Sequence, residues 1–303
     1  MDSPYLILNP TMPSIALFLL STFFLSLSLS SCQNNLQKHT IQAEGYVYSS
    51  DSERIHYISA GQGDVTLLFI HCWSCNSTFW NAQLSYFSKK YQVIALDLAG
   101  HGASGASRKN YSIAKFADDV SAVVNDLKLN NVILIGHSMG GAVAVEAALI
   151  LPEKVRGVVA VDAFATGYPW PEKAAIAAQL APFQENYSNA TFKMVEGMFA
   201  PHTGKALIYR IANDMASADP AVAISALQNL FLWMADEYPQ RRTELKVPLI
   251  NINARRRKQR PAGDKNIITV PFVGHFIPLE APLKFNQALA DAIAIIRPPV
   301  KAK

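Results

Sequence analysis

The chain has 303 residues, half of them hydrophobic and 17% charged, with a formal net charge of +4. So many apolar residues can bury a core, which excludes an intrinsically disordered protein, and the length suits one large α/β domain with an inserted subdomain. The densest positive charge, at residues 255–260, lies between two predicted elements. Such a run is typical of a solvated loop, so we expect no nucleic-acid partner.

An apolar segment lies near the start of the chain, over residues 15–31. It is short and rich in serine for a membrane-spanning helix, and Leu-Ser-Ser-Cys at its end resembles the lipobox of bacterial lipoproteins. We therefore predict a signal peptide over residues 1–31, lipidation at Cys32 and a tether over residues 32–44. This predicts an exported protein that is anchored to a membrane of the bacterial cell envelope. An ordinary signal peptide or membrane anchor is the alternative. Export signals usually carry positive charge before the apolar segment, and this chain departs from that pattern because no Lys or Arg precedes it.

The rest of the chain predicts strands that alternate with helices. Eight runs predict strands, at residues 45–50, 54–60, 65–70, 91–98, 131–135, 155–161, 247–252 and 267–272. Helices are predicted after Ser112, from Met139 to about Leu151, and from about Pro282 to Ile296. Several of the strands are continuously apolar, which is typical of strands covered on both faces. The alternation predicts an α/β fold with a doubly wound, mostly parallel, eight-stranded sheet.

One long segment, residues 165–240, interrupts this alternation between the sixth and seventh predicted strands. Its pattern is helical and rich in aromatic residues and methionine. We predict a helical cap whose apolar side chains mostly form its own core, while a minority line a pocket beneath it. The core of the fold then comprises residues 45–164 and 241–297.

The sequence Gly136-His-Ser138-Met-Gly140 lies between a predicted buried strand and a predicted helix. Gly-x-Ser-x-Gly in this context predicts a nucleophile elbow, in which glycines leave room for a serine on a strained turn. The helix that begins at Met139 would offer backbone N–H groups and the positive end of its dipole to a developing oxyanion. A purely structural tight turn is the alternative.

With this elbow the chain resembles the α/β-hydrolase superfamily, in its cap-bearing serine hydrolase and esterase branch, over nearly all of residues 45–297. The sequences DLAGHGAS at residues 97–104 and Gly-His at His275 support the resemblance. It implies Ser138 as nucleophile, His275 as catalytic base, and an acyl-enzyme formed from a small carboxylic ester, with no metal or organic cofactor. A serine excludes the dehalogenase and epoxide-hydrolase branches, which use a carboxylate nucleophile. Amides, thioesters, lactones and C–C bonds remain open as substrates.

The sequence His71-Cys72-Trp73-Ser-Cys75 takes the place of the His-Gly that ends the third strand in this superfamily. The resemblance implies that Trp73 and Met139 donate the two backbone N–H groups of the oxyanion hole. A thioredoxin-like site would need its CxxC at the start of a helix in a smaller fold, and a zinc site would need a second ligand pair. The sequence offers neither. Cysteine in place of glycine restricts the backbone, and in an exported protein Cys72 and Cys75 could form a disulfide.

The resemblance leaves the third member of the triad open. The superfamily most often places an acid just after the seventh strand, where this chain has Arg255, which cannot orient the histidine. Some branches carry the acid after the sixth strand, where this chain has Asp162. We predict that Asp162 orients His275, with Asp264 in the next loop as the alternative. If neither carboxylate reaches His275, we expect a ligand-binding protein that kept the fold and has weak or no catalysis.

Overall fold

The computed structural model describes residues 43–164, 172–255 and 266–296. All of these belong to one compact unit, Gln42–Lys303. The predicted signal peptide, Cys32 and Asp264 lie outside the described residues. Within the described ranges, every helix is too short or too polar to cross a membrane.

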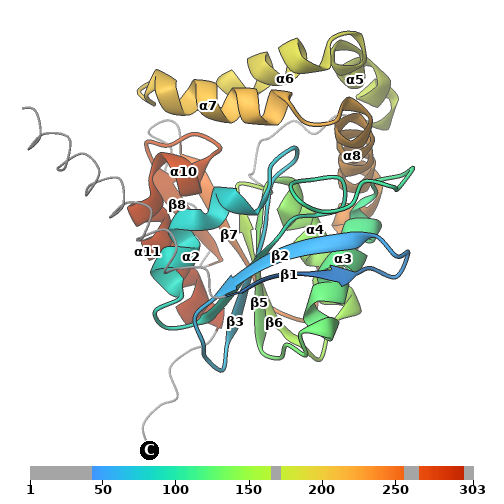
Figure 1. Cartoon of the computed structure of the whole chain (residues 1–303). Coiled ribbons are helices and arrows are strands. Elements are labelled where there is room, and N and C mark those ends of the chain that lie inside the picture. The colour runs from blue at the N-terminus through green and yellow to red at the C-terminus, as the bar shows by residue number, and fades with distance from the viewer. Residues whose placement is uncertain (1–42, 165–171, 256–265, 297–303) are drawn as a thin grey trace, which may run out of the picture. The chain divides into compact units, whose positions relative to one another are not determined.

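Eight strands form one sheet in the order β1-β2-β4-β3-β5-β6-β7-β8 (Figure 1). They are β1 Ala43–Tyr48, β2 Arg54–Ala60, β3 Thr66–Ile70, β4 Gln92–Leu96, β5 Val132–His137, β6 Val155–Val161, β7 Leu249–Arg255 and β8 Ile267–Pro271. Strand β2 pairs antiparallel with β1 and with β4, and all other neighbouring strands are parallel. The predicted fold class is confirmed, although strand boundaries shift by up to three residues, and β1 begins at Ala43 rather than Gly45.

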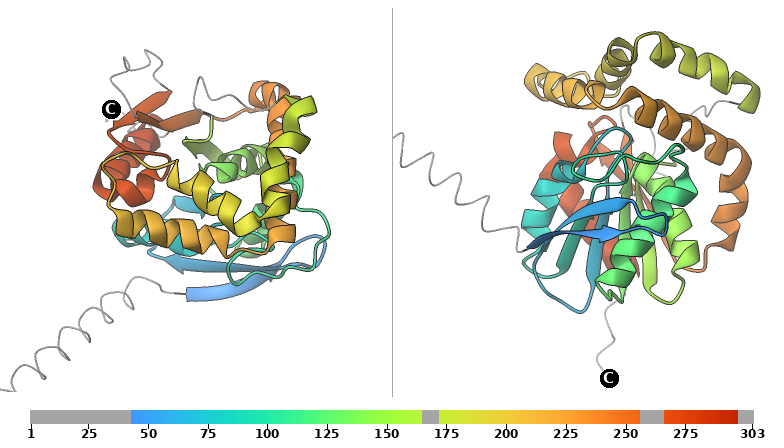
Figure 2. Two further views of the ribbon diagram at one scale, coloured as in Figure 1. Left: turned by 90° about the horizontal axis from the view of Figure 1, so that it is seen from above. Right: turned by 45° about the vertical axis from the view of Figure 1, so that its right-hand side comes forward.

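Helices cover both faces of the sheet because successive residues of the central strands point to opposite sides. The covering helices are α2 Asn81–Phe87, α3 Ile113–Asp126, α4 Met139–Ile150 and α11 Pro282–Ile296. On β3, Leu68 and Ile70 pack in the cluster that contains α3 and α4. Leu67 and Phe69 pack in the other cluster, with α2 and α11. Both faces are therefore buried (Figures 1 and 2), as the continuous apolar runs predicted.

The insertion between β6 and β7 is helical, as predicted. It contains η2 Lys173–Ala175, α5 Ile176–Glu185, α6 Tyr187–Glu196, α7 Lys205–Ala216, α8 Pro220–Leu232, η3 Trp233–Glu237 and α9 Tyr238–Glu244. Helices α5, α6 and α7 lie beyond the carboxyl ends of the parallel strands (Figure 2), whereas α8 contacts α3 and α9 contacts α4. We call residues 172–240 the cap. Its position places it over the ends of β3, β5 and β6, where the predicted catalytic residues follow their strands.

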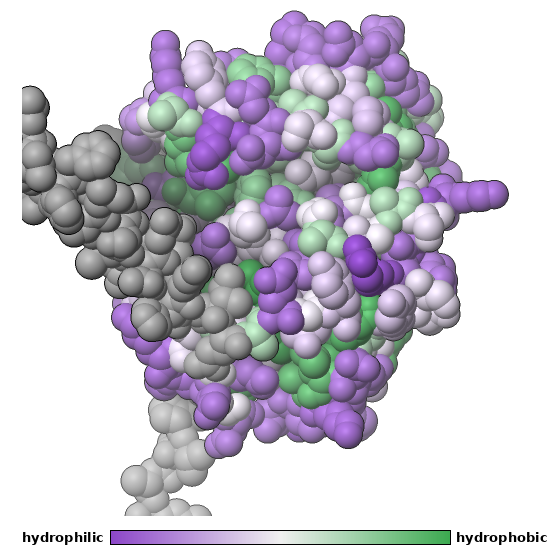
Figure 3. All heavy atoms as spheres, in the orientation of Figure 1, coloured by the Kyte–Doolittle hydropathy of each residue, from purple (hydrophilic) through white to green (hydrophobic). Residues whose placement is uncertain are grey.

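Apolar side chains on the surface are scattered. Figure 3 shows them as small separate groups among polar residues on the face seen in Figure 1. The most exposed large apolar residues, Leu283, Tyr48 and Phe272, belong to α11, to β1 and to the end of β8. The described part of this face therefore gives no sign of a broad apolar interface.

Candidate active site

The segment around Ser138 has the geometry of a nucleophile elbow. Ser138 follows β5 directly and has φ 53° and ψ −118°, a backbone conformation that is strained for a residue with a side chain. A Cβ on Gly136 would overlap Gly140 O, and a Cβ on Gly140 would lie 2.5 Å from Ile70 O. Only glycine fits at both positions, because the start of α4 packs directly against the end of β5 at Gly136 and against the end of β3 at Gly140.

His275 and Asp162 form a hydrogen-bonded pair. His275 Nδ1 lies 2.7 Å from Asp162 Oδ2, and Asp162 Oδ1 accepts the backbone N–H of Ala254 at 2.9 Å. Burial alone would raise the pKa of Asp162, but the hydrogen bond and charge of His275 outweigh burial and hold this pKa below its usual value. Asp162 is therefore an ionised acceptor, so His275 Nδ1 carries the shared proton.

Ser138 and His275 line the same small cavity of about 30 Å³ beneath the cap. Its other lining residues are Cys72, Trp73, Met194, Met198, Met215 and Phe276. In the part of the chain that the structure describes, no hydrogen bond joins Ser138 to His275. Such contacts commonly shorten only when substrate binds. Because Nδ1 of His275 bonds Asp162, Nε2 is the nitrogen available to the Ser138 hydroxyl.

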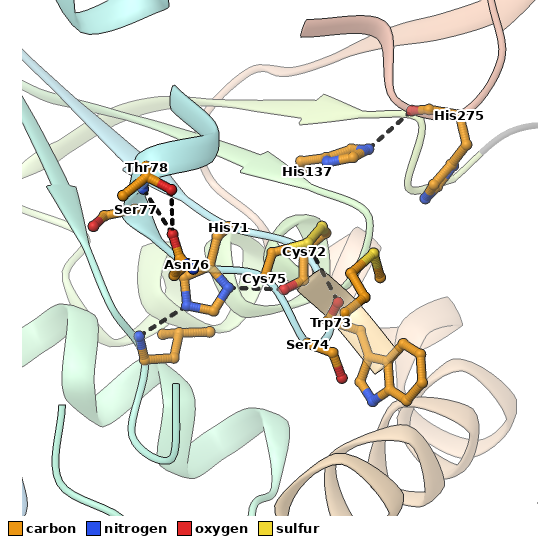
Figure 4. Close-up of a disulfide and its surroundings, with 12 residues drawn as sticks. His71, Cys72, Trp73, Ser74, Cys75, Asn76, Ser77, Thr78, His137 and His275 are labelled. Atoms are coloured by element: carbon orange, nitrogen blue, oxygen red, sulfur yellow. Dashed lines mark hydrogen bonds between the residues drawn. A yellow bond between two sulfur atoms is a disulfide. The ribbon is translucent and has the colours of Figure 1, made fainter. Parts of the chain in front are cut away.

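The peptide between Cys72 and Trp73 is fixed by a buried histidine (Figure 4). His71 Nε2 accepts the backbone N–H of Leu98 at 3.0 Å, so the ring proton is on Nδ1, which donates to Cys72 O at 2.7 Å. Burial lowers the pKa of His71 and keeps the ring neutral. The N–H of Trp73 points away from that carbonyl, since the two groups of a trans peptide are opposed. Among the described residues, neither Trp73 N nor Met139 N has an acceptor, which leaves both free for an oxyanion.

His137, inside the elbow, supports the loop of His275. Its Nε2 lies 2.9 Å from His275 O, and the two rings lie 4.8 Å apart (Figure 4). Burial and the nearby charge of His275 lower the pKa of His137 to about 3. The ring is therefore neutral near pH 7 and donates its Nε2 proton to the His275 carbonyl.

The family model described as Alpha/beta hydrolase family matches residues 67–288. This chain belongs to the α/β-hydrolase family. The match includes all of β3 except Thr66, the elbow, the whole cap and the His275 loop, and it confirms the predicted family.

Among curated proteins, the α/β hydrolase resembles relatives in Acinetobacter. It is 35% identical over 107 residues to (E)-2-((N-methylformamido)methylene)succinate hydrolase of Acinetobacter baylyi, which is 35% of this chain and 40% of that protein. It is 37% identical over 99 residues to the bifunctional esterase/perhydrolase DCH of Acinetobacter calcoaceticus, which is 32% of this chain and 36% of that protein. The chain thus spans between 30% and 40% of the length of the curated relatives that it matches.

Solved structures match over most of the α/β hydrolase. The structure titled Est816 as an N-acyl homoserine lactone degrading enzyme has a TM-score of 0.68 and 26% identity, and the match covers 81% of this chain and 99% of that one. An esterase from Exiguobacterium antarcticum has a TM-score of 0.70 and 21% identity, with coverage of 84% and 99%. At 21% identity, the similarity to the Exiguobacterium esterase shows only that the two proteins share a fold.

A feature that the sequence did not predict fastens the cap to the loop of His275. The backbone N–H of His275 donates to Met198 O at 2.8 Å. Glu280 Oε2 accepts the N–H of Gly274 at 3.0 Å, the N–H of Ala200 at 3.1 Å and the hydroxyl of Thr203 at 2.7 Å. The only signal in the sequence was a carboxylate five residues after the histidine of this α/β hydrolase.

The structure brings Ser138, His275, Asp162 and Trp73 together at the carboxyl ends of β3, β5, β6 and β8, and Met139 follows Ser138 directly. The two cysteines of the CxxC sequence of this α/β hydrolase, Cys72 and Cys75, are joined to each other in a disulfide. Within the described ranges, no group of three or more His, Cys, Asp or Glu residues is placed to hold a metal ion. The cap residues that line the cavity, Met194, Met198 and Met215, could not be singled out from the helical pattern.

Proposed function

We propose that this chain is a serine hydrolase that cleaves carboxylic esters through a triad of Ser138, His275 and Asp162. The observation that supports this most is the 2.7 Å hydrogen bond between His275 Nδ1 and Asp162 Oδ2. The same histidine lines a cavity together with Ser138. The carboxylate holds the imidazole in the tautomer whose Nε2 can take a proton. The similarity to proteins described as esterases also favours an ester substrate.

In the proposed reaction, Ser138 Oγ attacks the ester carbonyl while His275 Nε2 takes its proton. The backbone N–H groups of Trp73 and Met139 bind the oxyanion, and the start of α4 adds the positive end of its dipole. His275 then gives its proton to the departing alcohol, which leaves an acyl group on Ser138. Water, activated by the same histidine, hydrolyses this acyl-enzyme. Asp162 remains ionised throughout and stabilises the imidazolium.

The cavity favours a short and uncharged acyl group. Apart from the two reacting residues, its described lining is made of methionine, aromatic and disulfide side chains, which offer no partner to a charged substituent. A volume of about 30 Å³ holds about two water molecules, although methionines can repack around a slightly larger group. A lactone is an internal ester, so the similarity to the Est816 structure adds lactones to the substrates worth testing.

The test is hydrolysis of p-nitrophenyl acetate, butyrate and octanoate and of an acyl homoserine lactone by the full-length chain. We expect the two short esters to be turned over faster than the octanoate, and Ser138→Ala to lose at least about 10⁴-fold in kcat/KM. Turnover that Ser138→Ala leaves intact would contradict the proposed nucleophile. Binding of an ester without any turnover would instead support the ligand-binding alternative.

We also propose that the chain is exported and anchored to a membrane by lipid on Cys32. Support comes from the Leu-Ser-Ser-Cys sequence that ends at Cys32 and from the Cys72–Cys75 disulfide, a bond typical of oxidising compartments. The test is labelling with an alkyne fatty acid in a bacterial host. The parent should be labelled and Cys32→Ser should not, while equal labelling of both proteins would contradict the proposal.

A further inference from the structure

A disulfide closes the turn that follows β3 (Figure 4). It joins Cys72 to Cys75, whose Cα atoms lie 5.2 Å apart, and the backbone N–H of Cys75 donates to Cys72 O at 3.2 Å. Between them, Ser74 has a φ of 53°, in the left-handed region that few residues other than glycine adopt readily. The turn is thus held in one conformation by a covalent bond and by a hydrogen bond across the same pair of residues.

This turn determines where the N–H of Trp73 points. The carbonyl of Cys72 accepts two hydrogen bonds, from His71 Nδ1 at 2.7 Å and from Cys75 N at 3.2 Å. Because the peptide is planar, two donors on its carbonyl fix the direction of the Trp73 N–H on the other side. One of those donors belongs to Cys75, whose position the disulfide sets directly.

Other contacts hold the turn and do not involve the disulfide. The Trp73 indole N–H donates to Ala223 O on α8 at 2.7 Å, and Ser74 Oγ lies 3.0 Å from Tyr187 OH on α6. These bonds tie the two middle residues of the turn to the cap. Cleavage of the disulfide would therefore leave the fold and the cap in place and would release chiefly the Cys75 amide.

The disulfide also borders the cavity that contains Ser138. Cys72 lines this cavity together with Ser138 and His275, and it lines a second small cavity next to it. Both cysteines are almost fully buried, at 2% and 3% exposure, and Cys72 is the one that lines the cavity of Ser138.

We propose that the Cys72–Cys75 disulfide is a positioning element that aims the oxyanion-binding N–H of Trp73, so that hydrolysis depends on the oxidised state of this pair. This inference rests on the proposed function. In the redox step, a dithiol reductant attacks one sulfur through a mixed disulfide and is itself oxidised to a cyclic disulfide. Its two electrons and two protons convert Cys72 and Cys75 to thiols.

The experiment measures kcat and KM for p-nitrophenyl acetate with the full-length chain in three states. These are the untreated protein, the protein reduced with dithiothreitol, and the reduced protein after reoxidation with oxidised glutathione. We expect kcat to fall at least tenfold with KM changed less than about threefold, since loss of one oxyanion donor lowers kcat by about 10²–10³. Reoxidation should restore kcat. Inhibition by a boronic acid, whose tetrahedral adduct on serine places an anionic oxygen in the same hole, should weaken in parallel.

Two variants serve as controls. Cys32→Ser removes the third cysteine of the chain and should respond to the reductant as the parent does. Cys72→Ala/Cys75→Ala should have a low kcat that the reductant does not change. The number of free thiols should rise by two on reduction, and circular dichroism should show a retained fold with a melting temperature only a few degrees lower.

The possible results separate this inference from the proposed function. Turnover that depends on Ser138 but has the same kcat in both redox states would overturn the positioning role alone. Free thiols at both positions before reduction, or loss of the fold after it, would overturn it as well. Turnover that Ser138→Ala retains would instead contradict the proposed function.

Discussion

Replacing Asp162 with asparagine changes a single acceptor in the hydrogen-bond network around His275. In the parent, Asp162 Oδ1 accepts the Ala254 N–H at 2.9 Å and Oδ2 accepts from His275 Nδ1 at 2.7 Å. An asparagine keeps its oxygen toward Ala254, because the opposite orientation would place two donors face to face. Its NH₂ group then faces Nδ1, which must become an acceptor, and the ring proton moves to Nε2. That nitrogen can no longer take the proton of Ser138.

The expected loss is large and confined to catalysis. Holding the histidine of a serine triad in the wrong tautomer lowers kcat by about 10⁴-fold, which corresponds to about 5.5 kcal/mol of transition-state stabilisation. The melting temperature should change little, since asparagine has the same shape and keeps the bond to Ala254. The assay is kcat/KM for p-nitrophenyl acetate in the parent and in Asp162→Asn, together with thermal unfolding of both proteins.

Asp264→Asn is the matched control, because Asp264 is the other carboxylate that the sequence offers near the end of β7. We expect this variant to keep its activity within about twofold. A loss of less than tenfold in Asp162→Asn would refute the assignment of Asp162. A large loss in Asp264→Asn alone would transfer the role to Asp264.

Three further predictions follow from other contacts of the site. His137 has a folded pKa of about 3, against about 6.5 when unfolded, so its contribution to stability is complete above pH 6.5 and is lost as the pH falls. When the pH is lowered from 7 to 4.5, urea unfolding should show that the free energy of unfolding falls by roughly 2–3 kcal/mol more in the parent than in His137→Gln. Met215→Ala enlarges the cavity and should raise the ratio of kcat/KM for the octanoate to that for the acetate ester about tenfold. Glu280→Ala leaves the buried N–H groups of Gly274 and Ala200 without an acceptor and should lower kcat at least tenfold through displacement of His275.

Each of these three predictions has an outcome that would contradict it. Equal losses of stability in the parent and in His137→Gln would mean that His137 is protonated in the fold. An unchanged ester ratio in Met215→Ala would show that Met215 does not limit the acyl group. Thr203→Val, which removes only the cap hydroxyl from Glu280, is the control for Glu280→Ala, and equal effects of the two variants would refute a specific role for the His275 loop.

The fold could be predicted because its signals are local. Strands β3 and β5 are mostly apolar and buried along their whole length, and a serine between two glycines joins β5 to a helix. Ser112 was predicted to start a helix, and its side chain accepts the N–H of Lys115 at the start of α3. The short elements η1 Ser77–Trp80, α2 and α10 Ile277–Glu280 were not predicted, because segments of one or two turns show no clear helical period.

The remaining features depend on distances between segments that are far apart in the chain. The sequence offered Asp162 and Asp264 as acids, and only the pairing of β6 with β7 brings Asp162 beside Ala254 and beneath His275. The same holds for the methionines of the cavity, which share a general apolar pattern with the core of the cap. Glu280 links the cap to the loop of His275 by accepting the backbone N–H groups of Ala200 and Gly274. Every residue except proline has such a group, so a sequence does not show which ones Glu280 will bind.

The place of the carboxylate that bonds His275 bears on how such sites change in evolution. Val161 and Ile252 are partners in the register of β6 and β7, so Asp162 lies beside the last residues of β7, and its carboxylate accepts the N–H of Ala254, the residue before Arg255. Adjacent strands lie only about 4.8 Å apart, so an acid at the end of either strand can reach the same imidazole. A chain with an acid at the end of both strands could lose the one on β7 and keep an acid bonded to its histidine, and the present chain has Asp162 on His275 and Arg255 at the end of β7. A search that requires a carboxylate after the seventh strand would therefore miss every protein whose histidine bonds an acid after the sixth strand, as His275 does here.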